Sequence, residues 1–442
     1  MMNLVLAKAD TARASSETFA AARDRLPGTG KVAEARQQAF EAYERAGLPH
    51  RRLEDWKYTD LRALMREVLP LAAAPDARAL ERAKAALASL PAVDACRLVL
   101  VDGVLVPALS NLAALDAGIR VQTLREMLED GANAVRADLL NSGAVSGPMI
   151  ALNSAMATDG AVITVADGVA LAKPVHIVHI ATCSKAALYT RSFLKLGNNA
   201  RATLLESFVA ADGASSYQAN DAITVWLGDG VELEHVRLMA DAADAANITT
   251  AIFTVGAKSR LTTFNMTSGG SLSRYQGYLT FAGEGSEVNA NGVNLLNGRQ
   301  HADTTLFLDH AVPHCASREV FRSVVDDRAH SVFQGRIIVR PDAQKTDAKM
   351  MTRALLLSDE AEADNKPELE IFADDVTCGH GATTGALDES LLFYLRARGL
   401  SEKEAQALLI QAFVGEAIES IASDVLRELA IETAQRWLAA RG

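Results

Sequence analysis

The sequence predicts a mainly β protein in which a parallel β-helix lies between helical domains at the two ends of the chain. Between residues 161 and 357, short alternating segments rich in Val, Ile, Thr, Leu and Phe replace the helical pattern. Four glycines follow hydrophobic residues there, at Gly197, Gly228, Gly256 and Gly283, spaced 31, 28 and 27 residues apart. Near-equal spacing with a strand after each turn is typical of a solenoid whose coils bury their faces on one another. A sandwich or barrel of hairpins is the alternative, which the scarcity of Asn-Gly turns disfavours.

Both ends of the chain have a helical composition. Ala, Arg, Glu and Gln dominate residues 11–95. After Gly385 an apolar stripe recurs at helical spacing, and Ser401 with Glu404 forms a capping-box pattern. Helices at the end of a solenoid have little core of their own, so we expect part of this stripe to dock a partner. The predicted organisation is an N-terminal helical domain (1–95), a small α/β connection (96–150), the β-helix core (151–385) and a C-terminal helical domain (386–442).

Composition and charge argue against several classes of function. The net charge of −11 disfavours nucleic-acid binding. No stretch approaches 18 consecutive apolar residues, so we expect no membrane span. The apolar run Leu4–Ala7 is too short for a secretion signal, which makes the cytoplasm the expected compartment. Gly28–Lys31 only faintly resembles a phosphate loop, because Arg25 and Val32 stand where Gly and Ser or Thr belong. We therefore expect no nucleotide to bind this chain.

The four cysteines do not form a complete ligand set. They stand at positions 96, 183, 315 and 378, without a C-x-x-C pair. This pattern is neither a disulfide framework nor a set that holds an iron–sulfur cluster by cysteine alone. We expect Cys96 and Cys183 to be small buried residues, as free cysteines commonly are.

Four histidines within the predicted solenoid are interpreted as structural. His310, His314 and the adjacent Cys315 suggest a metal site only on a helix, and no helix is predicted there. His176 and His179 are three residues apart in a predicted strand, so they face opposite sides of it.

Residues 367–394 concentrate the chemistry of the chain. A strand with period-two alternation is expected over residues 368–376, and Cys378 and His380 follow it. On an extended backbone these two side chains project to the same face, and the glycines beside His380 leave room for a ligand or another chain. Thiolate and imidazole together suit zinc, copper or iron. Two ligands do not complete a site, so the pattern implies a site shared with another chain, for which Cys378 is either a ligand or a packing residue.

An unusual N-terminal segment, residues 48–61, places Trp56 and Tyr58 among charged residues. Aromatic residues of this kind are enriched at partner interfaces. The favoured interpretation is that the segment pins its aromatic rings onto the main body, with Thr59 capping a helix that starts at Asp60.

Several motifs together resemble the SufB/SufD family of the SUF iron–sulfur cluster assembly machinery, and in particular its SufD branch. They cover most of the C-terminal half of the chain and one N-terminal motif, whereas residues 150–300 match by architecture. Gly379 and Thr384 depart from the common pattern, in which Ser and Val are frequent, but both changes keep the Cys–His pair. The motifs are residues 54–59, 314–318, 335–348, 355–358, 366–375, 378–383 and 392–396.

The resemblance implies a right-handed β-helix that acts as a non-catalytic scaffold. It implies a partner, SufB, at the edge near residues 368–376, and docking of the ATPase SufC on residues 388–442. The functional histidine of the family falls on His380, as an iron ligand or a proton-handling group, with Cys378 a weaker candidate. The expected cofactor is a transient iron–sulfur cluster or iron at the interface. Whether the isolated chain forms a homodimer is not decided by the sequence.

Two other classes of function are considered. A carbohydrate-active β-helix enzyme would need paired carboxylates or a calcium site. The solenoid acids show no such spacing, and the scattered cysteines disfavour a stand-alone metal carrier. The acids in question are Glu206, Glu232, Glu234 and Glu287.

Overall fold

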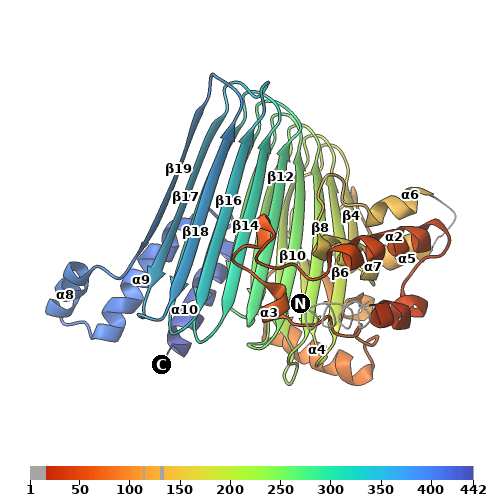
Figure 1. The fold of residues 1–442 in the computed structure, drawn as a ribbon, viewed down its shortest axis with the longest axis horizontal. Helices are drawn as coiled ribbons and strands as arrows, with labels where there is room; N and C mark the ends of the chain where they lie inside the picture. Colours follow the sequence, from red (N-terminus) through yellow and green to blue (C-terminus); the bar gives the residue numbers. More distant parts are fainter. Residues whose placement is uncertain (1–15, 113–114, 130–133, 442) are drawn as a thin grey trace, which may run out of the picture.

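The computed structural model describes residues 16–112, 115–129 and 134–441, and its strands wind into a long parallel solenoid (Figure 1). Residues 1–15, which include the run Leu4–Ala7 and the start of the predicted N-terminal helical domain, lie outside the described residues. From β4 onward, successive strands alternate between two sheets, so each coil contributes one strand to each wall. The predicted parallel β-helix is therefore confirmed, and the sandwich or barrel alternative is wrong.

Neighbouring strands in both sheets are parallel, except β1–β2 and β3–β4. In hydrogen-bonded order, the first sheet consists of β18 (Glu362–Ile371), β16 (His330–Val339), β14 (His301–His310), β12 (Leu272–Phe281), β10 (Ala246–Val255), β8 (Gln218–Leu227), β6 (Ala187–Leu196), β4 (Ala161–Val165) and β3 (Ile119–Thr123). The second consists of β19 (Thr377–Gly385), β17 (Asp347–Leu356), β15 (Ala316–Val325), β13 (Glu287–Leu296), β11 (Arg260–Thr267), β9 (Glu232–Ala240), β7 (Arg201–Ala210), β5 (Val175–Ala181), β1 (Cys96–Val101) and β2 (Val104–Leu105).

The in-register ladders stack equivalent side chains into columns between the two sheets. One column of the first sheet runs through Val225, Phe253, Leu279, Leu308 and Ile337, each paired with the next. All five are buried in the main core. Because each residue packs on its equivalents in the coils above and below, a side chain inside the solenoid is defined by partners roughly one coil away in sequence.

The recurring glycines mark places where coils approach most closely. Gly256 and Gly283 follow the ends of β10 and β12. A Cβ atom on Gly283 would overlap the backbone of Ala257 in the coil below, and one on Gly256 would overlap the backbone of Gly228. The glycine period in the sequence is therefore a direct consequence of backbone stacking at this corner of each coil.

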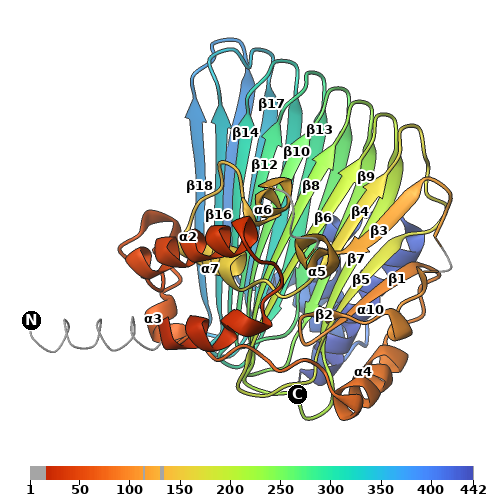
Figure 2. The same ribbon diagram turned by 90° about the vertical axis from the view of Figure 1, so that its right-hand side faces the viewer.

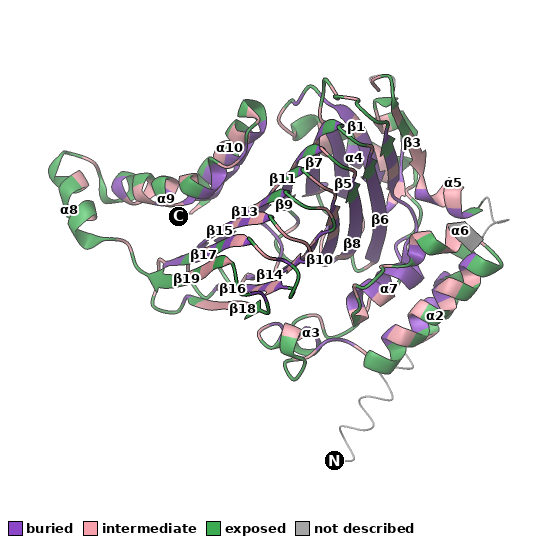
Figure 3. Cartoon of the chain, turned by 90° about the horizontal axis from the view of Figure 1, so that it is seen from above, coloured by how far each residue is buried: buried purple, intermediate pink, exposed green. Residues whose placement is uncertain are grey.

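Helices cover opposite sides of the solenoid (Figures 2 and 3). Helix α7 contacts β6 and β8 of the first sheet and packs against α2, whereas α9 contacts β13 and β15 of the second sheet. No helix in the described part of the chain is long and apolar enough to cross a bilayer. The helices are α2 (Lys31–Ala46), α3 (Leu61–Leu64), α4 (Ala77–Ser89), α5 (Leu124–Glu129), α6 (Ala134–Ala137), α7 (Pro148–Met156), α8 (Glu389–Ala397), α9 (Glu402–Ile418) and α10 (Asp424–Ala440).

The N-terminal aromatic segment is pinned to the first sheet. Trp56 is buried, and the guanidinium of Arg274 on β12 lies 3.8 Å from its ring centroid. Arg274 is itself buried and paired with Asp303 on β14. The favoured interpretation of the segment is thus confirmed for Trp56. The expected cap is wrong, because the Thr59 hydroxyl donates to Asp303 and the Asp60 carboxylate caps α3 instead.

Candidate functional site

The last coil of the solenoid leaves two strands at the sheet edges. β18 pairs with β16 alone and β19 with β17 alone, so each has one side without a strand partner among the described residues (Figure 1). An edge of this kind invites pairing with another chain. The strand expected over residues 368–376 is β18, which begins earlier, at Glu362, and ends at Ile371. Residues 372–376 instead form the turn that carries the chain from one sheet to the other.

Cys378 and His380 project from β19 to the same face, as the sequence predicts. Cys378 pairs in register with Ala348 and His380 with Met350, both buried residues on β17. Cys378 is half-buried and packs against the core between the sheets, whereas His380 is exposed. The pair therefore lies where the solenoid interior opens at its last coil. A Cβ atom on Gly379 would meet nothing within 4 Å, so one of the flanking glycines does leave open space.

The Cys378 thiol is not an activated nucleophile in this arrangement. Burial raises its pKa, and the neighbouring carboxylates of Asp347 and Glu319 raise it further. Thiolates are favoured by nearby positive charge, whereas the charges that act on this thiol are those of carboxyl groups. Cys378 would therefore become a ligand only when an incoming metal ion displaces its proton, which leaves to solvent.

A buried carboxyl group lies beneath the candidate pair. Glu319 on β15 pairs in register with Met350, which pairs in turn with His380. Glu319 is fully buried. Burial raises the pKa of Glu319 to about 8. The sequence analysis did not single out this residue, because its position under His380 depends on coil register.

Charged contacts bring the N-terminal motif to the same end of the first sheet. Arg336 on β16 forms ion pairs with Glu368 on β18 at 3.3 Å and with Asp55 at 3.8 Å. Lys366 on β18 pairs with Glu54 and, at 3.3 Å, with Glu368. Three of the motifs that carry the family resemblance, residues 54–59, 335–348 and 366–375, thus share one network next to the terminal coil.

Exposed apolar side chains cluster on the elements around this coil. Ile371 ends β18 and Phe372 follows it, and Phe372 is 60% exposed. The short helix α8 has no buried residue, and its Leu391, Phe393 and Tyr394 are exposed by 51%, 74% and 54%. Figure 3 shows α8 standing away from the solenoid. Exposed apolar groups of this density mark interaction surfaces.

The C-terminal helices begin as the sequence predicts. The Asp388 carboxylate accepts hydrogen bonds from two backbone N–H groups of α8, and Ser401 and Glu404 form the capping box of α9. A groove with a volume of ≈ 290 Å³ separates α8 and α9 from β17 and β19. Its lining includes Arg353, Leu355, Thr384, Leu387, Leu409 and Phe413.

The other residues that the sequence offers as metal ligands, His310, His314 and the cysteines, do not come together in one site among the described residues. His310 is buried, stacked on Phe281 with 4.3 Å between ring centroids, whereas His314 lies in an exposed turn. The four cysteines are free thiols. Cys96 is buried as expected, but Cys183 is only half-buried.

Three of the four acidic residues named for the solenoid have separate partners and do not pair with one another. Glu232 pairs with Arg201 at 3.5 Å and Glu287 with Arg260 at 3.1 Å. Glu234 accepts hydrogen bonds from the backbone that leads into α10. The fourth acid, Glu206, is fully buried.

The structure brings together one group that the sequence analysis missed. Among residues 16–112, 115–129 and 134–441, His179, Glu206 and Asp221 form the one set of three metal-ligating side chains, with ligand atoms within 4.8 Å of one another. As expected, His176 and His179 face opposite sides of β5, since His176 bonds Ser207 and His179 stacks on Phe208. The structural interpretation of His179 did not foresee its acidic neighbours. The available signal was the spacing of 27 residues between His179 and Glu206, about one coil, and of 15 between Glu206 and Asp221, about half a coil.

Comparisons with known proteins agree with the fold and with the motifs. The chain matches the family model "SUF system FeS cluster assembly, SufBD core domain" over residues 179–413 and the model "SufBD protein N-terminal region" over residues 19–177. It is 32% identical over 398 residues to an iron–sulfur cluster assembly SufBD family protein of Synechocystis, covering 87% of this chain and 86% of the relative.

Two relatives carry the SufD name. Identity to the iron–sulfur cluster assembly protein SufD of Escherichia coli is 31% over 405 residues, covering 91% of this chain and 92% of that protein. Identity to SufD of Bacillus subtilis is 25% over 306 residues, covering 66% and 65%. Together with the parallel solenoid and the Cys378–His380 pair on its last strand, these matches show that the chain belongs to the SufBD family of the SUF iron–sulfur cluster assembly system.

Proposed function

We propose that this chain is a non-catalytic scaffold subunit for iron–sulfur cluster assembly, in which His380 and Cys378 supply part of a site that a partner subunit completes. The observation that carries the proposal is the position of His380, which is exposed on the outermost strand of one sheet, with Cys378 beside it on the same face. A cluster takes about four protein ligands, mostly thiolates with occasional imidazoles. Iron and sulfide are here the cargo of the site.

The proposed partner is SufB, the other member of the SufB/SufD pair. A second β-helix aligned with the edges of β18 and β19 would satisfy their free backbone groups and bring its own ligands to His380. The exposed side chains of Ile371 and Phe372 at the end of β18 support an interface here. A second copy of this chain could use the same edges, so a homodimer of the isolated subunit competes with the heterodimer.

The proposed docking surface for the ATPase SufC is the C-terminal region, residues 388–442. Helices α9 and α10 bury one face against the second sheet, including Ile410, Val414 and Leu426. Helix α8 contacts α9 but has no fully buried residue, and Phe393 is the most exposed large apolar residue there. An apolar helix that leaves most of its surface exposed beside a packed helical base suits a protein partner.

The test of the shared site is the replacement His380→Ala, in the chain co-expressed with SufB and SufC. The purified complex is assayed for iron, acid-labile sulfide and the absorption of the cluster. We expect the complex to assemble in normal yield but to lose its cluster. The control is His314→Asn, which replaces an exposed histidine in a turn whose left-handed backbone suits asparagine. Unchanged cluster content in the His380 variant would refute the proposal.

A further inference from the structure

The interior of the solenoid near its first coils contains a polar layer between the two sheets. His179 on β5 and Glu206 on β7 come from the second sheet, and Asp221 on β8 comes from the first. All three side chains are buried, with exposures of 9%, 0% and 1%. The layer lies at the opposite end of the solenoid from His380, which stands on the last strand.

Each of the three residues presents one atom without a hydrogen-bonding partner. These atoms are Nε2 of His179, Oε1 of Glu206 and Oδ2 of Asp221. The first two atoms lie 4.0 Å apart, and one ligand atom from each of the three residues lies within 4.8 Å of the other two. The other oxygen of each carboxylate is held from behind: Oε2 of Glu206 lies 2.7 Å from Nε2 of His235, and Oδ1 of Asp221 accepts from Thr190. The geometry therefore orients three free ligand atoms toward one point.

Among the described residues, no lysine or arginine bonds directly to the carboxyl groups of Glu206 and Asp221, and the one imidazole that bonds Glu206 is that of His235. The nearest buried guanidinium, Arg237, donates to Asn265 at 2.8 Å and to Thr249 at 2.7 Å, rather than to Glu206 or Asp221. Leaving buried polar atoms unpaired costs free energy, and buried carboxylates cost more than neutral groups. A cation at the centre would satisfy all three free atoms at once.

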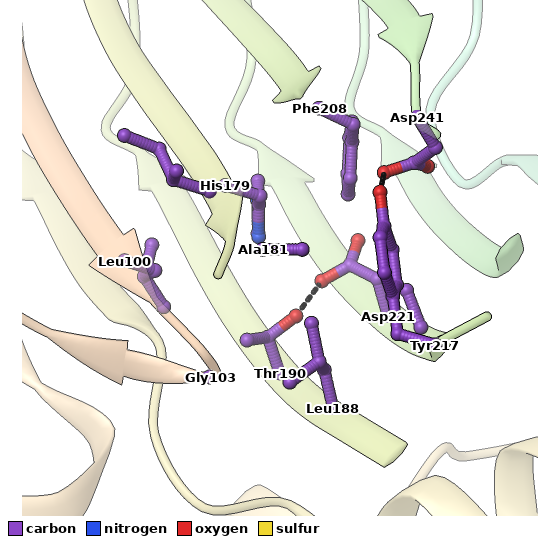
Figure 4. A pocket seen from close by; sticks show the side chains of 12 residues that line it. Leu100, Gly103, His179, Ala181, Leu188, Thr190, Phe208, Tyr217, Asp221 and Asp241 are labelled. Atoms are coloured by element: carbon purple, nitrogen blue, oxygen red, sulfur yellow. Dashed lines mark hydrogen bonds between the residues drawn. The ribbon is translucent and has the colours of Figure 1, made fainter. Parts of the chain in front are cut away.

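A small cavity adjoins His179 and Asp221, whereas Glu206 lies outside its lining (Figure 4). Its volume of ≈ 20 Å³ is near that of a single water molecule or ion. The imidazole of His179 is stacked on Phe208, with 4.2 Å between the ring centroids, which fixes the direction of its nitrogen. The cavity lining includes His179, Ala181, Thr190, Phe208, Asp221 and Asp241.

We propose that His179, Glu206 and Asp221 bind one divalent transition-metal ion of the Zn²⁺, Mn²⁺ or Fe²⁺ class inside the solenoid. One imidazole and two carboxylates are a donor set that these ions accept. The Thr263–His235–Glu206 chain of hydrogen bonds is the outer support that metal sites commonly have. The ion would join the two sheets at the first coils, and this role is separate from the cluster chemistry proposed at His380.

The test measures metal on the purified full-length chain without partners. The protein is stripped with a chelator, loaded with Zn²⁺ alone or Mn²⁺ alone by incubation and by refolding, passed through gel filtration and analysed for metal. We expect about one ion per chain, and a melting temperature that rises on loading. Asp221→Asn and Glu206→Gln should each weaken binding at least about tenfold. The matched control is Glu319→Gln, which alters an equally buried carboxyl group but should keep the ion.

Two outcomes would overturn the proposal. One is a wild-type chain that retains no ion after either loading. The other is retention of the ion by folded Asp221→Asn and Glu206→Gln, with loss in Cys378→Ala or His380→Ala instead. If Asp221→Asn and Glu206→Gln do not fold, the location of the ion is decided from the absorption spectrum of the wild-type chain loaded with Co²⁺. Its spectrum should lack thiolate-to-metal charge transfer, and a thiolate band would place the ion at a cysteine. None of these results bears on cluster yield in the SufB complex, so the two proposals fail separately.

Discussion

Glu319 and His380 lie in one column of the second sheet, separated only by Met350 on the strand between them. The upper residue is exposed at the open end of the solenoid, and the lower one is fully buried. A carboxyl group whose pKa burial raises to about 8 therefore stands directly below the candidate ligand pair.

The first prediction concerns the pH dependence of stability. Burial raises the pKa of Glu319 to about 8, above its ordinary value of 4.5. The native state therefore holds this proton where the unfolded chain has lost it, so stability falls as the pH rises from about 4.5 to about 8. Glu319→Gln removes this titrating group. Between pH 5 and pH 9 the variant should therefore lose less unfolding free energy than wild type does, by roughly 2–4 kcal/mol.

Urea unfolding of both proteins at pH 5, 7 and 9 measures this difference. Parallel pH profiles for Glu319→Gln and wild type would contradict the assignment of a raised pKa to this group.

The second prediction tests the stacked glycine corners. A Cβ atom on Gly283 would overlap the backbone of Ala257 in the coil below, so Gly283→Ala must separate two coils. We expect a loss of about 2–4 kcal/mol in the free energy of unfolding. The control Gly385→Ala adds the same atom where nothing lies within 4 Å. Equal stability of the two variants would show that the corner is not close-packed.

The third prediction concerns SufC docking. Deleting residues 386–442 would expose the apolar face that α9 and α10 cover, so a truncation confounds binding with solubility. Phe393→Asp changes a side chain that is 74% exposed and should leave the melting temperature of the free chain within about 2 °C. It should abolish co-purification with SufC. The control is Val425→Asp, which changes a residue that is 58% exposed on α10. It tests whether any acidic substitution in this region abolishes co-purification with SufC. Normal SufC recovery with Phe393→Asp would exclude α8 from the interface.

The elements that local patterns encode were predictable from the sequence. The glycine period from Gly197 to Gly283 predicted the solenoid, because at these four corners a Cβ atom would overlap the coil below. Side-chain alternation placed Cys378 and His380 on one face, and the Ser401 capping box gave the start of α9. Each of these signals lies within a few residues or in one repeated spacing.

Relationships between coils were not predictable in the same way. Glu319 lies under His380, and His179 lies beside Glu206, only because the strands pair in a particular register. A local pattern contains no information about that register, so these groups were not assembled. Likewise, the Thr59 hydroxyl does not cap a helix but donates to Asp303, which is more than two hundred residues away in the sequence.

The measurement that tests the shared site most directly compares acid-labile sulfide and iron on the isolated chain with those on its complex with SufB, after the same anaerobic reconstitution. Because His380 and Cys378 supply only part of a ligand set, we expect a cluster on the complex and none that survives gel filtration on the isolated chain. A stable cluster on the isolated chain, in the amount found on the complex, would contradict a site that needs its partner.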